Sequence, residues 1–301
     1  MAINYAEKYS KTIDERFTQA SITERAINKD FDFVGVQTVK VYSVPTVAMG
    51  DYKRQGAQRY GMPEELQNTV QEMTMGRDRA FTFTVDKGNE DETSGALNAG
   101  KALSRQINEV IVPEVDAYCL SKLAAYAAGQ SQTVTGTPAS EAYSMLTEAI
   151  QSVQNQVGYD EELVAFVNSV MWDGLQNSSE LTRHLEVADF RKGELNLQVK
   201  SLNGVAILPV PDSRMKSAFD FYDGVSEGKT DGGFQPATAA KSIGLLVLPR
   251  RAASLVKKTE QVRTFDPAHN PSADAWKFDY RLYYDLFIKN SMASAIYTYV
   301  Y

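Results

Sequence analysis

Residues 78–86 (DRAFTFTVD) and 110–118 (VIVPEVDAY) decide the fold prediction for this chain. In the first stretch, small and hydroxyl-bearing side chains alternate with Phe and Val, which is the period of a β-strand. The second stretch lies within a helical pattern over residues 96–128, where Pro113 should kink the helix or restart it at a first-turn position. Continuous, this helix would be about 50 Å long at roughly 1.5 Å per residue. We therefore expect this helix to be a central element along which other elements pack.

Three residues of this helix carry specific expectations. Glu114 and Asp116 follow Pro113 closely and suit the positive end of a helix. Cys119 is the one cysteine of the chain and lies on the apolar face. We therefore expect it to be a buried thiol that acts as a small hydrophobic group.

A long loop is predicted upstream of the first stretch. Residues 31–47 alternate and are rich in β-branched side chains, which predicts another strand, ended by Pro45. The two strands flank a polar stretch of about thirty residues, and loops of that length are uncommon inside compact domains. This pattern predicts an arm that needs an outside partner to be ordered. A disordered or lid-like loop is the alternative.

Residues 1–30 carry a narrow apolar stripe on an otherwise charged segment. Tyr5, Tyr9, Ile13 and Phe17 recur every four residues, as on one face of a helix. The stripe predicts a docking arm. An ordinary helix packed on its own domain is the alternative.

The remainder of the chain predicts a mixed α/β region that ends in strands. A helix over residues 140–157 should stop at Gly158. Residues 160–250 then alternate short strands and helices, as in a compact α/β module. The clearest strand patterns cover residues 276–288 and 295–301, so the chain should end in a sheet.

The composition bounds the class of protein. The chain has 301 residues, of which 43% are hydrophobic and 23% charged, as in globular proteins. Its formal net charge of -7 argues against a mainly nucleic-acid-binding or membrane-surface protein, whose footprint would be basic. One cysteine and two distant histidines exclude an intrachain disulfide, a multi-cysteine metal site and paired-histidine helix motifs. We expect a soluble chain made in a cytoplasm-like compartment, without a transmembrane helix.

One loop imitates two enzyme motifs. Residues 224–228 (GVSEG) fit G-x-S-x-G, but a nucleophile elbow needs a helix directly after the serine, and KTDGG follows. Residues 223–230 (DGVSEGKT) approach a phosphate-binding loop, but Asp223 stands where the first glycine should be. A surface loop is the favoured interpretation. No catalytic constellation, cofactor site or metal site is predicted.

Four strings, taken with the order of the elements, resemble a known family. They are DRAFTFTVD (78–86), NEDET (89–93), VIVPEVDAY (110–118) and DYRLYYDLF (279–287). The chain resembles the major capsid proteins of tailed bacteriophages, which have the HK97-type shell fold. The resemblance spans nearly the whole chain and implies an α+β fold with an N-terminal arm, an extended two-stranded loop, a long spine helix, a peripheral domain and an axial α/β domain.

The resemblance also divides the chain. The implied parts are the arm (1–30), the strands with the extended loop (31–92, the loop about 45–80), the peripheral domain with the spine helix (93–158), the axial domain (159–265) and C-terminal strands that return to the peripheral domain (266–301). Residues 224–236 would be a loop at the tip of the axial domain.

The function implied by the resemblance is structural, not enzymatic. Copies of the chain would self-assemble into hexamers and pentamers of an icosahedral phage head that encloses double-stranded DNA. Further expected partners are a separate scaffolding protein, a portal and decoration proteins, with DNA contacted weakly and non-specifically and no membrane involved. The expected location is the virion, after assembly in the host bacterial cytoplasm.

Candidate interface residues come from the arm and the loop. We expect Tyr5, Tyr9, Ile13 and Phe17 to dock the arm, and Asp51, Lys53, Arg54, Arg59, Arg77 and Arg79 to make polar contacts between subunits. Lys53 is the one lysine of the predicted loop, and no covalent cross-link through it is expected.

Two rival functions stay open. One is an encapsulin-like compartment that packages a cargo enzyme within the same fold. The other is an α/β nucleotide-binding or hydrolytic enzyme that uses the loop at residues 223–230.

Overall fold

A computed structural model describes residues 21–27, 38–43, 47, 49–56, 58–60, 69–88, 99–135, 141–178, 186–192, 195–202, 204–270 and 273–301. The chain divides into two units. The main unit comprises Met1–Lys29 and Arg77–Tyr301, and the loop unit comprises Asp30–Gly76. Each unit is described by itself.

The predicted long helix is present as three consecutive segments. They are α4 (Ala99–Gln106), a π-helical turn η1 (Ile107–Ile111) and α5 (Val112–Gly129). The irregularity falls directly before Pro113, which lacks an N–H and would clash with the carbonyl four residues back in a regular helix. The π turn accommodates the proline because the N–H of Val112 reaches back to the carbonyl of Ile107. The helix therefore continues through Pro113.

A seven-stranded sheet forms one layer of the main unit, in the order β4-β14-β11-β5-β8-β7-β6. The strands are β4 (Thr133–Thr135), β14 (Tyr297–Val300), β11 (Ile243–Pro249), β5 (Leu163–Val167), β8 (Val205–Pro209), β7 (Leu195–Leu202) and β6 (Glu186–Lys192). Every residue of β5 and β11 is buried, so both faces of the sheet centre are covered.

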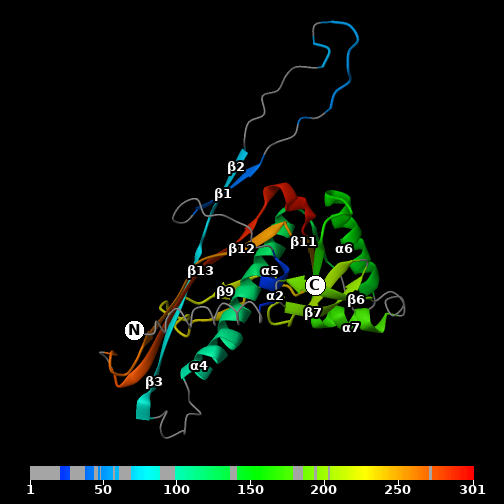
Figure 1. Ribbon diagram of the computed structural model, residues 1–301. Coiled ribbons are helices and arrows are strands. Elements are labelled where there is room, and N and C mark those ends of the chain that lie inside the picture. Colours follow the sequence, from blue (N-terminus) through cyan, green and yellow to red (C-terminus); the bar gives the residue numbers. More distant parts are fainter. Residues whose placement is uncertain are drawn as a thin grey trace. The chain divides into compact units, whose positions relative to one another are not determined.

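A three-stranded antiparallel sheet forms a second layer, with β13 between β12 and β3 (Figure 1). The strands are β3 (Arg77–Asp86), β12 (Ala253–Phe265) and β13 (Ala275–Ile288). The sequence predicts β3 and β13 but no strand over the residues of β12, which it assigns only to the axial domain. Its run of lysine, glutamate, glutamine and arginine hides the period, and its pairing with the strongly apolar β13 overrides that weak local pattern.

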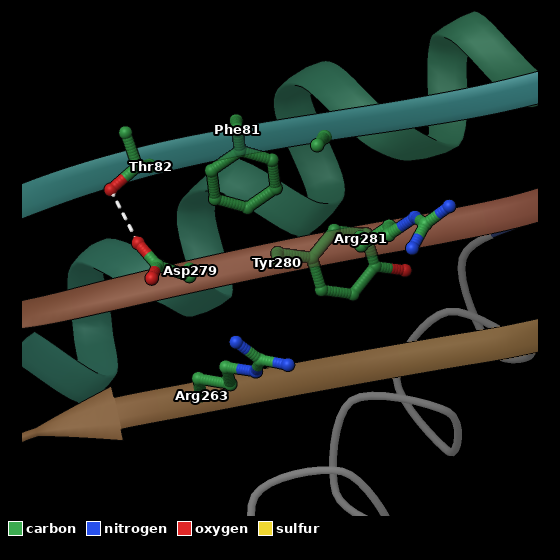
Figure 2. A pocket seen from close by; sticks show the side chains of 7 residues that line it. Phe81, Thr82, Arg263, Asp279, Tyr280 and Arg281 are labelled. Carbon is green, nitrogen blue, oxygen red and sulfur yellow. Dashed lines mark hydrogen bonds between the residues drawn. The ribbon is translucent and has the colours of Figure 1, made fainter.

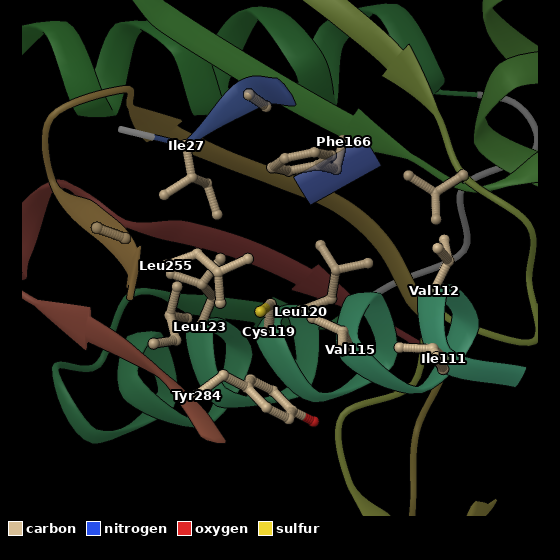
Figure 3. Packing of buried hydrophobic residues seen from close by; sticks show 14 of the residues in the cluster. Ile27, Ile111, Val112, Val115, Cys119, Leu120, Leu123, Phe166, Leu255 and Tyr284 are labelled. Atoms are coloured by element: carbon tan, nitrogen blue, oxygen red, sulfur yellow. The ribbon is translucent and has the colours of Figure 1, made fainter. Parts of the chain in front are cut away.

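Helix α5 packs between these two sheets (Figure 3). Val115, Cys119, Leu120 and Leu123 belong to one core cluster with Phe166 of the seven-stranded sheet. Tyr284 and neighbouring apolar residues of β13 join the same cluster from the three-stranded sheet. Because the helix is covered on opposite sides, its buried residues lie around most of its circumference. The expectation that other elements lie along it is confirmed.

Two helices cover the other face of the seven-stranded sheet. They are α6 (Ala142–Val157) and α7 (Ser169–Asn177), and they share a second core cluster with the alternate residues of β5 and β11. Gly158 ends α6 as predicted, with a φ of 90° that favours glycine. Asn168 caps α7 by accepting a hydrogen bond from the N–H of Met171.

The C-terminal strands separate instead of staying together. β13 lies in the three-stranded sheet, whereas a 3₁₀ turn η3 (Asn290–Ala295) leads into β14, which lies beside β11 in the seven-stranded sheet. The sheets therefore do not follow the predicted boundary at residue 265. The physical reason is burial: all four residues of β14 are buried, which an interior strand position satisfies.

A short hairpin completes the main unit. It consists of β9 (Phe219–Phe221) and β10 (Phe234–Pro236), which pair antiparallel around residues 222–233. Phe221 of β9 lies against Tyr118 of α5, with ring centroids 5.8 Å apart. The loop predicted for the tip of an axial module thus starts from a base beside the spine helix.

The loop unit contains a two-stranded ribbon. β1 (Thr38–Ser43) pairs antiparallel with β2 (Thr69–Thr74) in the register Thr38 to Thr74 through Ser43 to Thr69 (Figure 1). The loop has two paired strands, but the expected pairing of residues 31–47 with residues 80–85 is wrong. Its second strand is β2, which the sequence did not predict, and the predicted strand at residues 80–85 belongs to β3 in the main unit.

Candidate subunit interfaces

The far end of the loop unit is a defined turn. The N–H of Lys53 donates to the carbonyl of Arg59 at 2.9 Å, and Arg59 Nε donates to the carbonyl of Gly56 at 3.3 Å. Gly56 has a φ of 102°, a conformation that favours glycine at the turn. The rings of Tyr52 and Tyr60 meet edge to face across it, 5.1 Å apart. This end, residues 47–60, is called the loop tip below.

The loop tip carries apolar side chains in solvent. Met49 is fully exposed and Tyr60 is 94% exposed, while Val47 and Tyr52 are about half exposed. Among the described side chains of the loop unit, only Val39 and Met75 are buried hydrophobic residues. Clustered exposed apolar groups of this kind mark interaction sites on soluble proteins.

Four of the predicted polar contact residues lie at the loop tip. Asp51, Lys53, Arg54 and Arg59 are all exposed. Within the described part of the chain, no ion pair involves any of these four side chains. Their role between subunits stays a prediction.

The other two predicted contact residues, Arg77 and Arg79, have partners within the main unit. Arg79 forms a two-bond ion pair with Glu114 of α5, at 2.5 and 3.1 Å. The guanidinium of Arg77 lies 4.6 Å from the ring centroid of Tyr118 and 4.0 Å from that of Phe221. The structure therefore brings these arginines together with the spine helix and the hairpin. A contact with a second subunit stays a prediction for both.

The arm residues Tyr5, Tyr9, Ile13 and Phe17 lie outside the described residues, but the segment that follows them is well anchored. A short helix α2 (Ile22–Ala26) begins after the cap residue Ser21. Ala26 and Ile27 are buried in the core cluster of α5. The described segment next to the arm residues is therefore fixed in the main unit.

Asp116 holds this segment by its carboxylate, which is completely buried. It accepts hydrogen bonds from the hydroxyls of Ser21 at 2.7 Å and Thr23 at 2.6 Å, and from the N–H groups of Ile22 and Thr23 at 3.2 Å. Arg214 completes the site with an ion pair at 2.9 Å. Every charge and lone pair that burial would penalise is thus compensated.

A second buried ion pair holds the same segment. Glu24 of α2 is 1% exposed, and its carboxylate lies 3.0 Å from Lys257 Nζ of β12. The anchor is therefore tied to the spine helix and to the three-stranded sheet by separate contacts.

The sequence did not identify this anchor or the Arg79 partner. It predicted Glu114 and Asp116 as acids that suit a helix N-terminus, and α5 does begin at Val112 with Pro113 and Glu114 in its first turn. Their signal was the presence of two carboxylates in an otherwise apolar stretch, since buried acids need cationic or hydrogen-bonding partners. Nothing local in the sequence indicates which cations pair with them.

The loop with the enzyme-like motifs is closed on itself. Asp223 Oδ1 accepts the N–H groups of Val225 and Ser226 at 3.0 and 2.9 Å, and its Oδ2 accepts the Ser226 hydroxyl at 2.5 Å. Chiefly through the Ser226 hydroxyl, these bonds lower the pKa of Asp223 to about 2. The donors that a phosphate would need are thus occupied by a carboxylate of the chain itself.

The nucleophile-elbow interpretation fails on geometry as well. Residues 204–270, all described, contain no helix after Ser226, and the chain continues into β10. His269 lies in a local pair with Asp266, at 2.5 Å, and His184 lies outside the described residues. This loop is a surface loop with an internal cap.

A hollow of about 410 Å³ lies on the three-stranded sheet (Figure 2). Its polar lining is Thr82, Arg263, Asp279 and Arg281. Thr82 donates to Asp279 at 2.7 Å, and Arg281 pairs with Asp78 at 2.9 and 2.5 Å. Thr82, Asp279 and Arg281 are thus bonded to one another or to a neighbour on the same sheet.

The remaining candidates among the described residues are the single cysteine, groups of metal-ligand side chains and membrane-spanning helices. Cys119 is fully buried as predicted, and burial raises the pKa of its thiol well above the ordinary value. Within the described ranges, no group of three or more His, Cys, Asp or Glu side chains could hold a metal ion. In those ranges, no helix combines the length and apolar character needed to cross a bilayer.

Comparison with solved structures identifies the fold. One structure from Mycobacterium phage Che8 covers 93% of this chain and 90% of its own, with a TM-score of 0.62 and 14% identity. The asymmetric unit of the bacteriophage PhiM1 mature capsid covers 93% and 86%, with a TM-score of 0.59 and 12% identity. A virus-like particle from Pyrococcus furiosus covers 99% and 100%, with a TM-score of 0.56 and 9% identity.

No family model and no curated protein matches the sequence. The structural likeness extends over nearly the whole chain at identities of 9 to 14%, so what it shows is the fold. The chain has the fold of phage capsid structures, and the resemblance stated from the sequence is confirmed at that level.

Proposed function

We propose that this chain is a major capsid protein: a structural subunit whose copies form the hexamers and pentamers of an icosahedral phage head around double-stranded DNA. The observation that carries the proposal is the capsid fold combined with a loop tip that exposes Met49 and Tyr60 without a core of its own. A shell subunit needs such surfaces, because its stability in the shell depends on burial against other copies.

The loop tip is the main proposed contact with a neighbouring copy. Tyr52 and Tyr60 offer large aromatic area with few rotatable bonds, which suits interface anchors. The exposed charges of Asp51, Lys53, Arg54 and Arg59 surround them, as in the polar rim of an interface. Each exposed ion pair is worth about 0–1 kcal/mol, so the charges would mainly orient the contact.

The arm is the second proposed contact. Tyr5, Tyr9, Ile13 and Phe17 would dock on a neighbouring subunit, starting from the segment that Asp116 fixes. Anchoring the root of an arm limits the volume that it explores and raises its effective concentration near one site.

The proposed setting follows from this function. The chain would be assembled in a bacterial cytoplasm with a separate scaffolding protein, a portal and decoration proteins, and would reside in the virion. The net charge of -7 suits a container that contacts packaged DNA weakly and without sequence preference. No enzymatic activity, cofactor or membrane is part of the proposal.

Substitution at the loop tip tests the interface. We expect Met49→Asp with Tyr60→Asp to abolish assembly, because charged groups would have to be buried against a neighbour. Tyr159→Asp is the matched control, since Tyr159 is also 75% exposed but lies outside both the loop tip and the hairpin at residues 219–236. Light scattering under conditions where the parent chain assembles is the readout. Normal assembly of the loop-tip variant would contradict this interface.

A compartment that packages a cargo enzyme is the second candidate. It is favoured by one observation, the match over 99% of this chain to a structure described as a virus-like particle from Pyrococcus furiosus. The contents of purified particles discriminate the two functions. Nuclease-protected DNA supports the phage head, and a co-purifying enzyme with no DNA supports the compartment.

A further inference from the structure

Two arginines stand where the chain enters the main unit from the loop unit. The loop unit ends at Gly76, and β3 begins at Arg77. Arg77 and Arg79 are the first and third residues of β3, and both reach elements far away in sequence. The contacts of these two arginines therefore fix the first residues of β3, the strand that follows the loop unit.

Arg77 lies over two aromatic rings, one of the hairpin and one of the spine helix. Its guanidinium carbon is 4.0 Å from the ring centroid of Phe221 in β9 and 4.6 Å from that of Tyr118 in α5. Stacking of a guanidinium on aromatic faces is favourable and depends on the planar shape of arginine. Tyr118 is itself fixed, because its hydroxyl donates to Asp285 at 2.7 Å.

Arg79 joins three elements through one guanidinium. Besides its ion pair with Glu114 of α5, its Nη1 donates to the carbonyl of Tyr222 at 2.6 Å and its Nη2 donates to the carbonyl of Gly233 at 3.3 Å. These carbonyls follow β9 and precede β10, on opposite sides of the hairpin loop. The planar, forked set of N–H donors of arginine reaches all of these acceptors at once, whereas the single ammonium group of a lysine cannot.

The hairpin that these contacts reach is small. Its two strands have three residues each, and a two-stranded hairpin is marginal by itself. Its loop, in contrast, is preformed by the Asp223 cap and exposes Val225 at its end. The hairpin thus offers a defined exposed end on a base that the two arginines hold.

We infer that Arg77 and Arg79 form a joint that couples the hairpin at residues 219–236 to the start of β3, where the chain leaves the loop unit. A neighbouring copy that contacts the hairpin end would then restrain the root of the extended loop, and a restrained loop would in turn restrain the hairpin. The neighbour in this statement rests on the proposed function. The coupling itself lies within one chain.

Hydrogen exchange on the full-length unassembled chain tests the joint in both directions. Arg79→Lys keeps a positive charge beside Glu114 but loses the fork, so we expect exchange of the hairpin amides to rise about tenfold. Phe221→Leu lies in the hairpin, yet it should speed exchange at residues 77–81 of β3 by a similar factor, because it removes the ring under Arg77.

Two matched controls accompany these variants. Arg281→Lys likewise loses the fork, at an exposed pair with Asp78 on the same sheet, and should leave hairpin exchange unchanged. Glu227→Gln changes the exposed end of the hairpin and should leave β3 exchange unchanged.

Exchange confined to the substituted element would overturn the joint: a fast hairpin with an unchanged β3 in Phe221→Leu, or the parent pattern in Arg79→Lys. If Arg79→Lys lowers the melting temperature too far to compare, Phe221→Leu decides alone. Because no assembled shell is needed, coupling without any assembly would leave the joint standing while the proposed function fails. Assembly without coupling would support the proposed function and overturn the joint.

Discussion

Asp116 is the residue on which three separate segments converge. Its buried carboxylate accepts hydrogen bonds from Ser21 and Thr23 and pairs with Arg214. Removing one side of a buried ion pair costs about 3–5 kcal/mol, because the remaining charge is left without a partner. We therefore expect Asp116→Ala to lower the free energy of unfolding by that amount in urea titrations.

Asp78→Ala is the control for this prediction. Asp78 pairs with Arg281 where both side chains are about half exposed, and exposed pairs are worth about 0–1 kcal/mol. Equal losses from the two substitutions would mean that burial of Asp116 contributes nothing to its effect.

Asp223 offers a test by pH. Its pKa falls from the ordinary 3.8 to about 2, first because the Ser226 hydroxyl and then because two backbone N–H groups bond to the ionised form. Since the folded pKa is depressed, the loop cap is complete above about pH 4 and is lost as the pH falls through about 2. Carboxyl NMR shifts should show this midpoint, and Ser226→Ala should raise it. A midpoint near 3.8 in the parent chain would contradict the cap.

For single residues, the sequence predicts whether a side chain is buried but not which residue it pairs with. The burial of Cys119 was predictable because its neighbours on the helix face are apolar. The partners of Asp116 and Arg79 lie 35 to 154 residues away, so no local pattern reports them.

Among the elements, α5 is the one whose packing we expect to contribute most to stability. It lies between the seven-stranded and three-stranded sheets, and Leu123 is completely buried in their shared cluster. Truncating a buried leucine costs about 2–5 kcal/mol, through lost burial and the cavity left behind. We expect a loss in this range for Leu123→Ala in the free energy of unfolding.

Val110→Ala provides the comparison on the same helical path. Val110 is 38% exposed in the π turn, and such surface truncations change stability by about 0.5 kcal/mol or less. A larger loss at Val110 than at Leu123 would place the core on the wrong side of the helix.

Elements with strong periodicity were predictable, and those defined by their partners were not. β3, β13, α6 and the spine helix follow from alternation or helical spacing. β2 and β12 are polar strands that exist because β1 and β13 pair with them, so tertiary pairing outweighs their local preference. The split of β13 from β14 likewise depends on sheets that only the folded chain creates.

Across the whole chain, the resemblance to phage capsid proteins came from four strings and the order of elements, and the structural likeness confirms the fold. The candidate contact residues were less predictable. Arg77 and Arg79 hold partners within their own chain, whereas the charges of the loop tip are exposed. The sequence indicates which polar residues lie on exposed segments. It does not indicate whether their partners come from the same chain or from another copy.

The mass of the purified chain in solution, measured by light scattering with negative-stain images of the same fraction, tests the shell proposal most directly. Megadalton spheres, or hexamers and pentamers that close when a scaffolding protein is added, are the predicted result. A 33.4 kDa monomer that stays monomeric with scaffold and under crowding would contradict it.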